Sequence, residues 1–237
     1  FVFWQLLSWA LYLILAFNFP NRPACQNAFK TFFVHRVGDV SFLCGIFLAY
    51  KYFGTLEFAE LFKAAAEQPQ VISLFSGMLD ISAVTAIALL IFVGAMAKSA
   101  QFPLHVWLPD TMDSPTPVSA LMHAGIINAG GFLLNRLAPF YALSPNTLHI
   151  VFVIGVLTVL LGASMMLAQN DIKKMLGFST MGQMGYMIME CGLGAFALAI
   201  FHLIAHGLFK ASLFLGAGKG IHAAREEPKL PDSPDHG

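Results

Sequence analysis

The chain has 237 residues, of which 57% are hydrophobic and only 11% charged. Soluble domains carry about 25% charged residues, so this composition is that of a membrane protein. The 13 basic and 13 acidic residues cancel, which argues against binding to nucleic acid. Three cysteines, Cys25, Cys44 and Cys191, lack the spacing of metal ligands and are interpreted as packing residues.

Apolar stretches follow one another along most of the chain. A helix that spans a bilayer needs about 20 apolar residues. Seven stretches meet this length, and we expect each to be a transmembrane helix. They cover roughly residues 1–19, 30–53, 78–108, 116–138, 147–168, 172–191 and 195–221. Residues 55–70 are amphipathic and charged, which predicts a short surface helix. The predicted fold class is therefore all-α, a polytopic bundle of transmembrane helices.

The ends and loops suggest how the chain is organised. Residues 1–222 are interpreted as one transmembrane domain and the polar residues 223–237 as a tail or loop. Because the chain starts inside an apolar run without a methionine, we interpret it as a fragment of a longer protein. The positive-inside rule predicts that it starts outside and ends in the cytoplasm, in a bacterial inner membrane. The cytoplasmic set is Arg22, Lys30, Lys173, Lys174, Lys219, Arg225 and Lys229, and the opposite set is Lys51, Lys63 and Arg136.

The strongest pattern lies in residues 195–215, where His202, His206 and Lys210 are spaced four residues apart. At about 100° per residue these positions sweep about 80°, so they face one side of a helix. Each step rises about 6 Å, a gap that one water molecule can bridge. Ionisable groups inside a membrane are costly, so we interpret this ladder as a proton relay, with a chance alignment as the alternative. No metal is expected, because HLIAH lacks the glutamate of HExxH and no third ligand is evident.

Lys98 lies in a long apolar run, and Pro103 follows five residues later. Proline removes a backbone donor, so we expect the helix to break there. Broken helices at membrane depth occur where they face protein or a water-filled cavity, and they often build ion sites. We therefore favour a proton-carrying role for Lys98 over a lysine that snorkels to the interface. For His123, early in the next span, a relay member and a hydrogen-bonded packing residue stay equally open.

Five other positions are candidates for a coupling or structural role. Arg36 and Asp39 are an i,i+3 pair that can neutralise itself on one helix face or take part in coupling. Asp171 is placed to cap a helix, and Lys173 two residues later is either a surface anchor or a proton entrance. Glu190 ends the sixth span, where a solvated carboxylate is the default interpretation and a proton exit the alternative.

Long motifs make the sequence similar to a known family. They read GAMAKSAQFPLHVWLPDTMDSPTPVSALMHA, DIKKMLGFSTMGQMGY and FHLIAHGLFKASLFL. They resemble the antiporter-like proton-conducting family, which includes chain 5 of respiratory complex I, the large subunit of Mrp-type sodium/proton antiporters and the membrane partner of DAB-type inorganic carbon pumps. The resemblance covers about residues 1–222. It implies a bundle of two inverted five-helix repeats, of which this chain would hold most of the first and the start of the second.

The resemblance also implies roles for the candidate residues. Lys98 matches the family's lysine on a broken helix, and His123 matches the histidine on the following helix. Lys210 matches the central lysine of a hydrated axis, and His202 and His206 match its neighbouring histidines.

One position departs from the family pattern. Arg36 and Asp39 match the family's RVGD element, but Gln5 stands where chain 5 proteins have a glutamate that pairs with the broken-helix lysine. Gln5 cannot ionise, so no charge-pair switch with Lys98 is expected. This difference, together with the run HAGIINAGGFLLNRL, favours the carbon-pump partner.

The function implied by the resemblance is proton translocation coupled to a partner subunit, either a redox arm or a zinc-containing cytoplasmic carbon-pump subunit. The chain has no motif for a redox cofactor, so no cofactor is expected and any oxidoreductase activity would belong to the complex. Membrane lipid and other subunits are the expected partners. Two alternatives stay open: a sodium/proton antiporter subunit, in which Asp39 or Glu190 would bind sodium, and a structural membrane scaffold without conduction.

Overall fold

The computed structural model describes residues 1–237 except 18, 75–78, 113 and 227–237. Its elements in chain order are α1 (Val2–Leu15), α2 (Arg22–Phe53), α3 (Phe58–Glu67), β1 (Val71–Leu74), β2 (Leu79–Ser82), α4 (Ala83–Lys98), the 3₁₀ turn η1 (Pro109–Thr111), α5 (Thr116–Ala124), the 3₁₀ turn η2 (Ile126–Asn128), α6 (Ala129–Arg136), α7 (Ala138–Ala142), α8 (Pro145–Leu167), α9 (Ile172–Gly192) and α10 (Phe196–Glu226).

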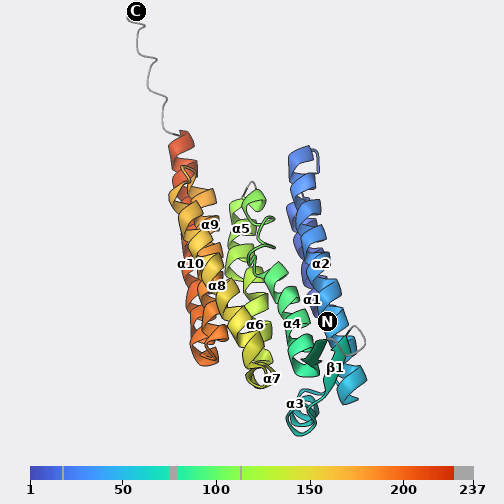
Figure 1. The fold of residues 1–237 in the computed structure, drawn as a ribbon. Helices are drawn as coiled ribbons and strands as arrows, with labels where there is room; N and C mark the ends of the chain where they lie inside the picture. The colour runs from blue at the N-terminus through green and yellow to red at the C-terminus, as the bar shows by residue number, and fades with distance from the viewer. Residues whose placement is uncertain (18, 75–78, 113, 227–237) are drawn as a thin grey trace, which may run out of the picture.

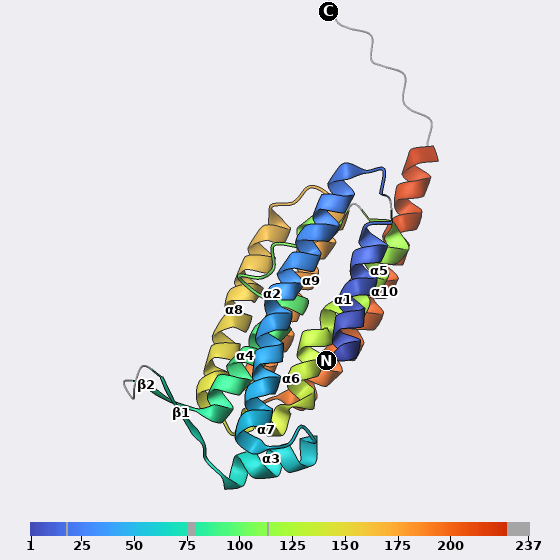
Figure 2. The ribbon, with the colours of Figure 1, turned by 90° about the vertical axis from the view of Figure 1, so that its right-hand side faces the viewer.

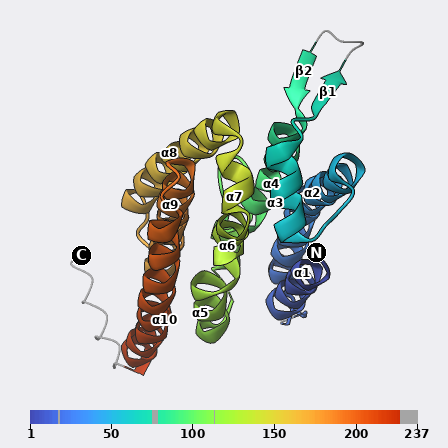
Figure 3. The same cartoon turned by 90° about the horizontal axis from the view of Figure 1, so that it is seen from below.

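The long helices run side by side in one bundle (Figure 1). Seen along the bundle, α1 and α2 lie on one side, α4 and α5 to α7 in the middle, and α8 to α10 on the other side (Figure 3). The helices α3 and α7 and the β1–β2 hairpin gather at one end, from which the hairpin projects (Figure 2). The C-terminal end of α10 lies at the opposite end (Figure 1). The predicted helical membrane fold is confirmed.

Fewer helices than expected meet the length of a full span. Within the described residues four are long and apolar enough to cross a membrane by length and composition, namely Arg22–Phe53, Thr116–Arg136, Pro145–Leu167 and Phe196–Gly216. The apolar helices α1 and α4 are shorter, with 14 and 16 residues. The prediction of seven full spans therefore exceeds the four that length and composition support, although α1, α4 and α9 lie alongside them in the bundle (Figures 1 and 2).

The predicted span 78–108 is only partly helical. Its first residues form β2, which pairs antiparallel with β1 so that Val71 lies opposite Ser82. This short hairpin is a small addition to the confirmed helical fold, and its β-branched residues Val71, Ile72 and Ile81 favour extended backbone. The helix α4 then ends at Lys98, before Pro103, as the proline predicts.

The predicted span 116–138 is interrupted as well, which the sequence did not predict. The helix α5 ends at Ala124, and α6 begins only after the 3₁₀ turn η2. Gly125 joins the two with φ −120° and ψ −71°, outside helical geometry. The side-chain amide of Asn128 donates to the backbone carbonyl of Ala124 at 2.8 Å, which satisfies an acceptor that the interrupted helix leaves free.

A single hydroxyl joins these two helix breaks. Ser99 follows the last residue of α4, and its Oγ donates to the carbonyl of Ile127 at 2.6 Å. The same Oγ accepts from the backbone N–H of Gly130 at 3.1 Å. A β-carbon on Gly130 would collide with this hydroxyl, so the close approach of α4 and α6 requires glycine there.

Two further boundaries differ from the prediction. The helix α2 begins at Arg22 and not near residue 30, because Pro23 is tolerated in the first turn of a helix. The helix α10 continues to Glu226, so residues 223–226 of the predicted tail are helical; the first proline after α10 is Pro228. The rest of the predicted tail lies outside the described residues. The predicted surface helix appears as α3.

The two sets of loop charges lie at opposite ends of the bundle. Lys51 is in the last turn of α2, Lys63 is on α3 and Arg136 ends α6, all at the end that carries the hairpin. The first turns of α2 and α9 and the end of α10 lie at the other end (Figure 1). The structure therefore separates the members of the two sets that it describes, Lys229 lying outside the described residues, and which end faces the cytoplasm stays a prediction from the positive-inside rule.

Glycines let α8 and α9 pack backbone to backbone. A β-carbon on Gly155 of α8 would lie 2.5 Å from the backbone nitrogen of Met189, and one on Gly185 of α9 would lie 2.7 Å from that of Val159. Real β-carbons do not approach a backbone this closely, so these helices can meet only through glycine. Close helix contact through small residues is a common way to join helices in a membrane.

Replacing Gly155 with alanine should therefore destabilise the bundle. Because the new methyl group meets backbone atoms, we expect a loss of about 1–3 kcal/mol in the free energy of unfolding. The matched control is Gly216→Ala, since a β-carbon on Gly216 meets nothing within 4 Å. Thermal unfolding of the detergent-solubilised protein checks this; equal unfolding temperatures for the two variants would contradict the packing described.

Candidate functional site

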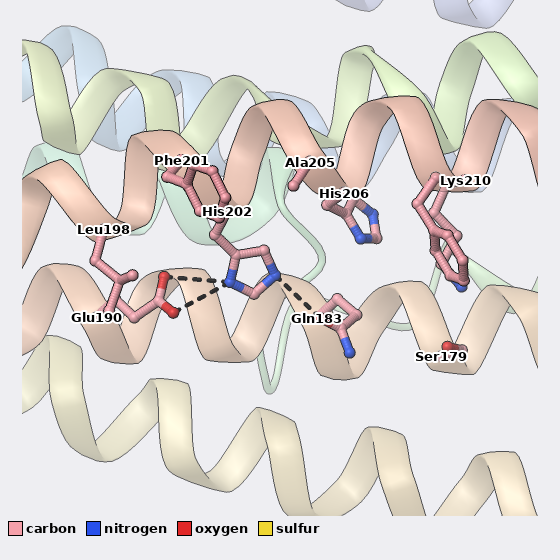
Figure 4. Close-up of a pocket in the computed structure, with 10 residues that line it drawn as sticks. Ser179, Gln183, Glu190, Leu198, Phe201, His202, Ala205, His206 and Lys210 are labelled. Carbon is pink, nitrogen blue, oxygen red and sulfur yellow. Dashed lines mark hydrogen bonds and ion pairs between the residues drawn. The ribbon is translucent and has the colours of Figure 1, made fainter.

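The helices α9 and α10 line a groove of about 620 Å³. His202, His206 and Lys210 extend into it from α10 toward α9 (Figure 4). The residues that complete its lining are Ser179, Gln183 and Glu190 from α9 and Leu198, Phe201, Ala205 and Phe209 from α10. The three members of the sequence ladder therefore share one partly polar cavity.

Both ring nitrogens of His202 face oxygen atoms. Its Nδ1 lies 3.2 Å from each carboxylate oxygen of Glu190, and its Nε2 lies 3.0 Å from Oε1 of Gln183 (Figure 4). An imidazolium, which carries a proton on both nitrogens, satisfies both contacts at once. If the side-chain amide of Gln183 rotated by 180°, its NH2 group could donate to Nε2 of a neutral His202 ring. This surrounding can therefore accommodate His202 in either protonation state.

The position of Glu190 differs from its default interpretation. A solvated carboxylate at the interface was expected, but the side chain is only 13% exposed and forms an ion-pair contact with His202. The two residues come from the end of α9 and the start of α10, which a short turn joins. Glu190 therefore belongs to the groove, at the end of the ladder nearest the α9–α10 turn.

His206 and Lys210 continue the ladder along α10. The ring of His206 lies 6.1 Å from that of His202, between centroids, and its Nε2 has no hydrogen-bond partner among the described residues. Lys210 is almost fully buried, and its ammonium donates to the backbone carbonyl of Leu176 on α9 at 3.3 Å. The spacing between the rings is within reach of a bridging water.

His123 lies in the last turn of α5, just before the helix break. The ring is fully buried and stacks on Phe214 of α10, with 4.5 Å between ring centroids. Neither ring nitrogen has a hydrogen-bond partner in the described part of the chain. A β-carbon on Gly207 would lie 2.9 Å from the carbonyl of Ala124, so α5 and α10 approach closely beside His123. The structure thus places His123 next to the ladder helix.

Lys98 lies in a different cluster, at the end of α4 where it meets α1. Its ammonium donates to the carbonyl of Trp4 at 3.1 Å and to the hydroxyl of Ser8, and it lies 5.1 Å from the centre of the Trp4 ring. The side chain is fully buried and does not snorkel to the surface. Neutral oxygens and an aromatic face therefore hold the Lys98 ammonium.

The RVGD residues complete the Lys98 cluster. Arg36 donates to the side-chain oxygen of Gln5 and lies 3.5 Å from Asp39. The other oxygen of Asp39 accepts from the indole nitrogen of Trp4 at 2.8 Å. Gln5 therefore contacts Arg36 and not Lys98, although it is on the same helix as the groups that hold the lysine. The i,i+3 ion pair expected from sequence is present.

The five predicted relay residues therefore form two groups. Lys98 lies with α1 and α2, whereas His123, His202, His206 and Lys210 lie along α5, α9 and α10. Among the described residues no direct hydrogen bond joins the two groups. The junction between them is formed by the two helix breaks that Ser99 links.

The other candidates lie at the end of the bundle where α9 begins. Asp171 caps α9, because its carboxylate accepts from the N–H of Lys174 at 3.0 Å. Lys173 donates to the carbonyl of Ser114, before α5, at 3.1 Å. Pro103 lies in the segment between α4 and η1, following Phe102, whose N–H donates to the hydroxyl of Thr158.

Several polar residues of these clusters were not selected from the sequence. Gln183 contacts His202 and lies seven residues before Glu190, so heptad spacing on α9 could have found it. Ser8 holds Lys98, and serine alone carries no signal in an apolar helix. His35 is fully buried on α2, four residues before Asp39, a spacing that matches the ladder on α10.

Comparison with known proteins agrees with this architecture. The family described as "NADH:quinone oxidoreductase/Mrp antiporter, TM" matches residues 1–232. A protein named probable inorganic carbon transporter subunit DabB1, from Halothiobacillus neapolitanus, is 50% identical over 233 residues, which are 98% of this chain and 41% of that protein. The chloroplastic NAD(P)H-quinone oxidoreductase subunit 5 of Lotus japonicus is 47% identical over 230 residues, 94% of this chain and 29% of that protein. The chain thus spans less than half of the length of these relatives.

Solved structures share the fold. A chain of the Mrp complex from Dietzia sp. aligns with a TM-score of 0.82 and 31% identity, over 97% of this chain and 25% of that one. A chain of the archaeal membrane-bound sulfane sulfur reductase aligns with a TM-score of 0.79 over 92% of this chain and 44% of that one; at 24% identity it shows the fold alone. The resemblance inferred from the sequence motifs is confirmed. This chain belongs to the NADH:quinone oxidoreductase/Mrp antiporter transmembrane family.

Proposed function

We propose that this chain is a proton-translocating subunit of a membrane complex, in which protons move by way of Lys98, His123, His202, His206 and Lys210. The observation that carries the proposal is the groove between α9 and α10. Three titratable side chains follow one another there on one helix face, beside a carboxylate that contacts the first of them. Ionisable groups in membrane helices are costly and mark ion or proton pathways more often than packing positions.

The contacts suit groups that take up and release protons. His202 can be satisfied in both protonation states, because the Glu190 carboxylate supports the charged ring and the Gln183 amide can donate or accept. Among the described residues, the ammonium groups of Lys98 and Lys210 donate to backbone carbonyls or a hydroxyl and not to a carboxylate. Carbonyls and hydroxyls stabilise an ammonium less than a direct ion pair does, so these contacts suit lysines that exchange a proton.

The carboxylates argue against the antiporter alternative. Sodium would need an acidic side chain with free oxygens, and Asp39 and Glu190 were the candidates. Asp39 contacts Arg36 and Trp4, and both oxygens of Glu190 face His202. A cation would have to displace these partners, so we favour protons as the transported species.

For the partner subunit we favour a cytoplasmic carbon-pump subunit over a redox arm. The support is the similarity to a protein named as an inorganic carbon transporter subunit, together with Gln5. Gln5 is uncharged and bonded to Arg36, so Lys98 has no switchable acidic partner at that position. We further propose that the membrane is a bacterial inner membrane, with the end that carries Lys173 and Lys174 in the cytoplasm.

Replacing Lys210 with methionine should abolish proton uptake by the assembled complex in proteoliposomes, because methionine fills the space without carrying a proton. We expect a loss of at least about tenfold, equivalent to about 1.4 kcal/mol in the barrier. The control is Lys63→Met, since the Lys63 side chain is 75% exposed on α3. A pH-sensitive dye inside the vesicles gives the rate. Equal rates for the two variants would support the scaffold alternative.

Glu190→Gln should slow proton uptake by removing the charge that supports the protonated His202. A hydrogen bond to a charged group contributes about 1.5–3 kcal/mol, so we expect a decrease of about tenfold or more. Glu190→Asp keeps the charge and should restore part of the rate, while Glu60→Gln on the exposed α3 should leave it unchanged. An Asp variant as slow as the Gln variant would show that charge is not what matters at this position.

Proton uptake should not depend on sodium. With both carboxylates committed to neighbouring side chains, replacing sodium by potassium in the vesicle experiment is expected to leave the rate within about twofold, a change below 0.5 kcal/mol. The antiporter alternative instead requires a rate that rises with the sodium gradient. Measuring uptake with opposed and with equal sodium concentrations separates the two.

A further inference from the structure

The buried face of α2 carries its own series of polar side chains. Asn27, Thr31, His35 and Asp39 follow one another at intervals of four residues. At about 100° per residue they sweep about 120°, so they lie along one broad stripe of the helix, and the series rises about 18 Å. Thr31, His35 and Asp39 are each at most 3% exposed. We call these four residues the α2 stripe.

The outer end of the α2 stripe reaches the exposed end of the bundle. The amide of Asn27 donates to the backbone carbonyl of Asp110 at 3.0 Å. Beside it, Lys30 forms an ion pair with the Asp110 carboxylate at 2.6 Å, and both of these side chains are more than one third exposed. The stripe therefore begins at a polar, solvent-accessible contact between α2 and η1.

The polar groups in the middle of the α2 stripe have only some of the hydrogen-bond partners that they could have. The hydroxyl of Thr31 donates to the carbonyl of Asn27 at 2.8 Å, which leaves its oxygen free to accept. Both ring nitrogens of His35 have no hydrogen-bond partner among the residues that the structure describes. The ring meets Trp107 edge-on at 4.7 Å, but the indole N–H of Trp107 already donates to Ala97. Since buried polar groups almost always have a protein or water partner, these nitrogens favour internal water beside His35.

The inner end of the stripe meets the Lys98 cluster. A β-carbon on Gly38 would meet Ala97 and the backbone of Gly94, so α2 and α4 are in close contact at this level. Asp39 follows Gly38 on α2, and Lys98 follows Ala97 on α4. Asp39 Oδ2 accepts no hydrogen bond from the described residues and lies 3.5 Å from the Arg36 guanidinium.

From this arrangement we propose that the α2 stripe is a proton access route, which connects the Lys30–Asp110 end of the bundle to Lys98 and uses His35 as a carrier. The inference rests on the proposed proton translocation and adds its path of entry. Steps of about 6 Å along the helix are short enough for single waters to bridge. A proton taken up on one nitrogen of His35 can leave from the other, so the ring needs no net displacement to pass it on.

The first test measures water access and does not depend on transport. In the assembled complex with Cys25, Cys44 and Cys191 replaced by serine, single cysteines are introduced as Thr31→Cys and His35→Cys. Silver ion, a small thiol-reactive cation, is added to one side of sealed vesicles, and the cysteines left unreacted are then counted with a fluorescent maleimide after denaturation. The matched control is Val37→Cys, which lies on the exposed face of α2 at similar depth.

We expect Thr31→Cys and His35→Cys to react at least about tenfold faster than Val37→Cys, and only when silver is added on the side of Lys30 and Asp110, because ions react with thiols in water and not in lipid. Reaction no faster than that of Val37→Cys, or equal reaction from both sides, would overturn the route.

The second test separates a carrier from a packing residue. His35→Phe keeps an aromatic edge against Trp107 but cannot carry a proton, whereas Trp107→Phe alters the same contact and leaves His35 in place. A carrier predicts that His35→Phe lowers proton uptake about tenfold or more and that Trp107→Phe changes it less. Equal effects of the two variants would assign His35 to packing. Should Lys210→Met leave uptake unchanged, the proposed function fails; should it abolish uptake while the stripe stays unreactive, only the route fails.

Discussion

The cost of burying positive charge in an apolar bundle is the constraint on which this structure depends. Lys98 and Lys210 are both almost fully buried, yet within the described part of the chain neither forms an ion pair with a carboxylate. Each ammonium is held by a backbone carbonyl of a neighbouring helix, from Trp4 in one case and Leu176 in the other. A carbonyl stabilises the protonated lysine but does not neutralise its charge, so whether the lysine keeps its proton depends on the groups around it. That is the state a group needs if it is to exchange a proton.

Close packing of helices surrounds the polar clusters. Glycine permits helices to approach one another backbone to backbone. Gly38 joins α2 to α4 near Lys98, Gly207 joins α10 to α5 near His206, and Gly155 joins α8 to α9. Two of these glycines, Gly38 and Gly207, therefore set how closely the helices beside Lys98 and His206 approach their neighbours.

Much of the fold and part of the site could be predicted from the sequence. The apolar runs predicted where the helices lie, and Pro103 predicted the end of α4. The spacing of four residues predicted that His202, His206 and Lys210 share one helix face. These features depend on helix geometry and on single residues with strong local effects. The break at Gly125 was missed, because one glycine in an apolar run carries a weak signal and the interruption is stabilised by the distant Ser99 and by Asn128.

Relations between helices were harder to predict. Lys98 lies apart from the other four relay residues because of which helices are neighbours. The periodicity of a single helix does not predict its neighbours. For the same reason Glu190 was interpreted as a solvated residue: its partner His202 lies across the α9–α10 turn. His35 was overlooked although it has the same spacing from Asp39 as the histidines of α10 have from one another, because a single histidine in a polar segment does not stand out.

The hydroxyl of Ser99 has a mechanical consequence. It holds the carbonyl of Ile127 in η2 and the amide of Gly130 in α6 at once, so the end of α4 beside Lys98 is tied to the start of α6, across the helix break that follows His123. A tilt of α4 would strain both of these hydrogen bonds and so pull on α6. Among the described residues no hydrogen bond joins Lys98 to His123 directly, so this oxygen is a mechanical link between the end of α4 and the helix that follows the break after His123.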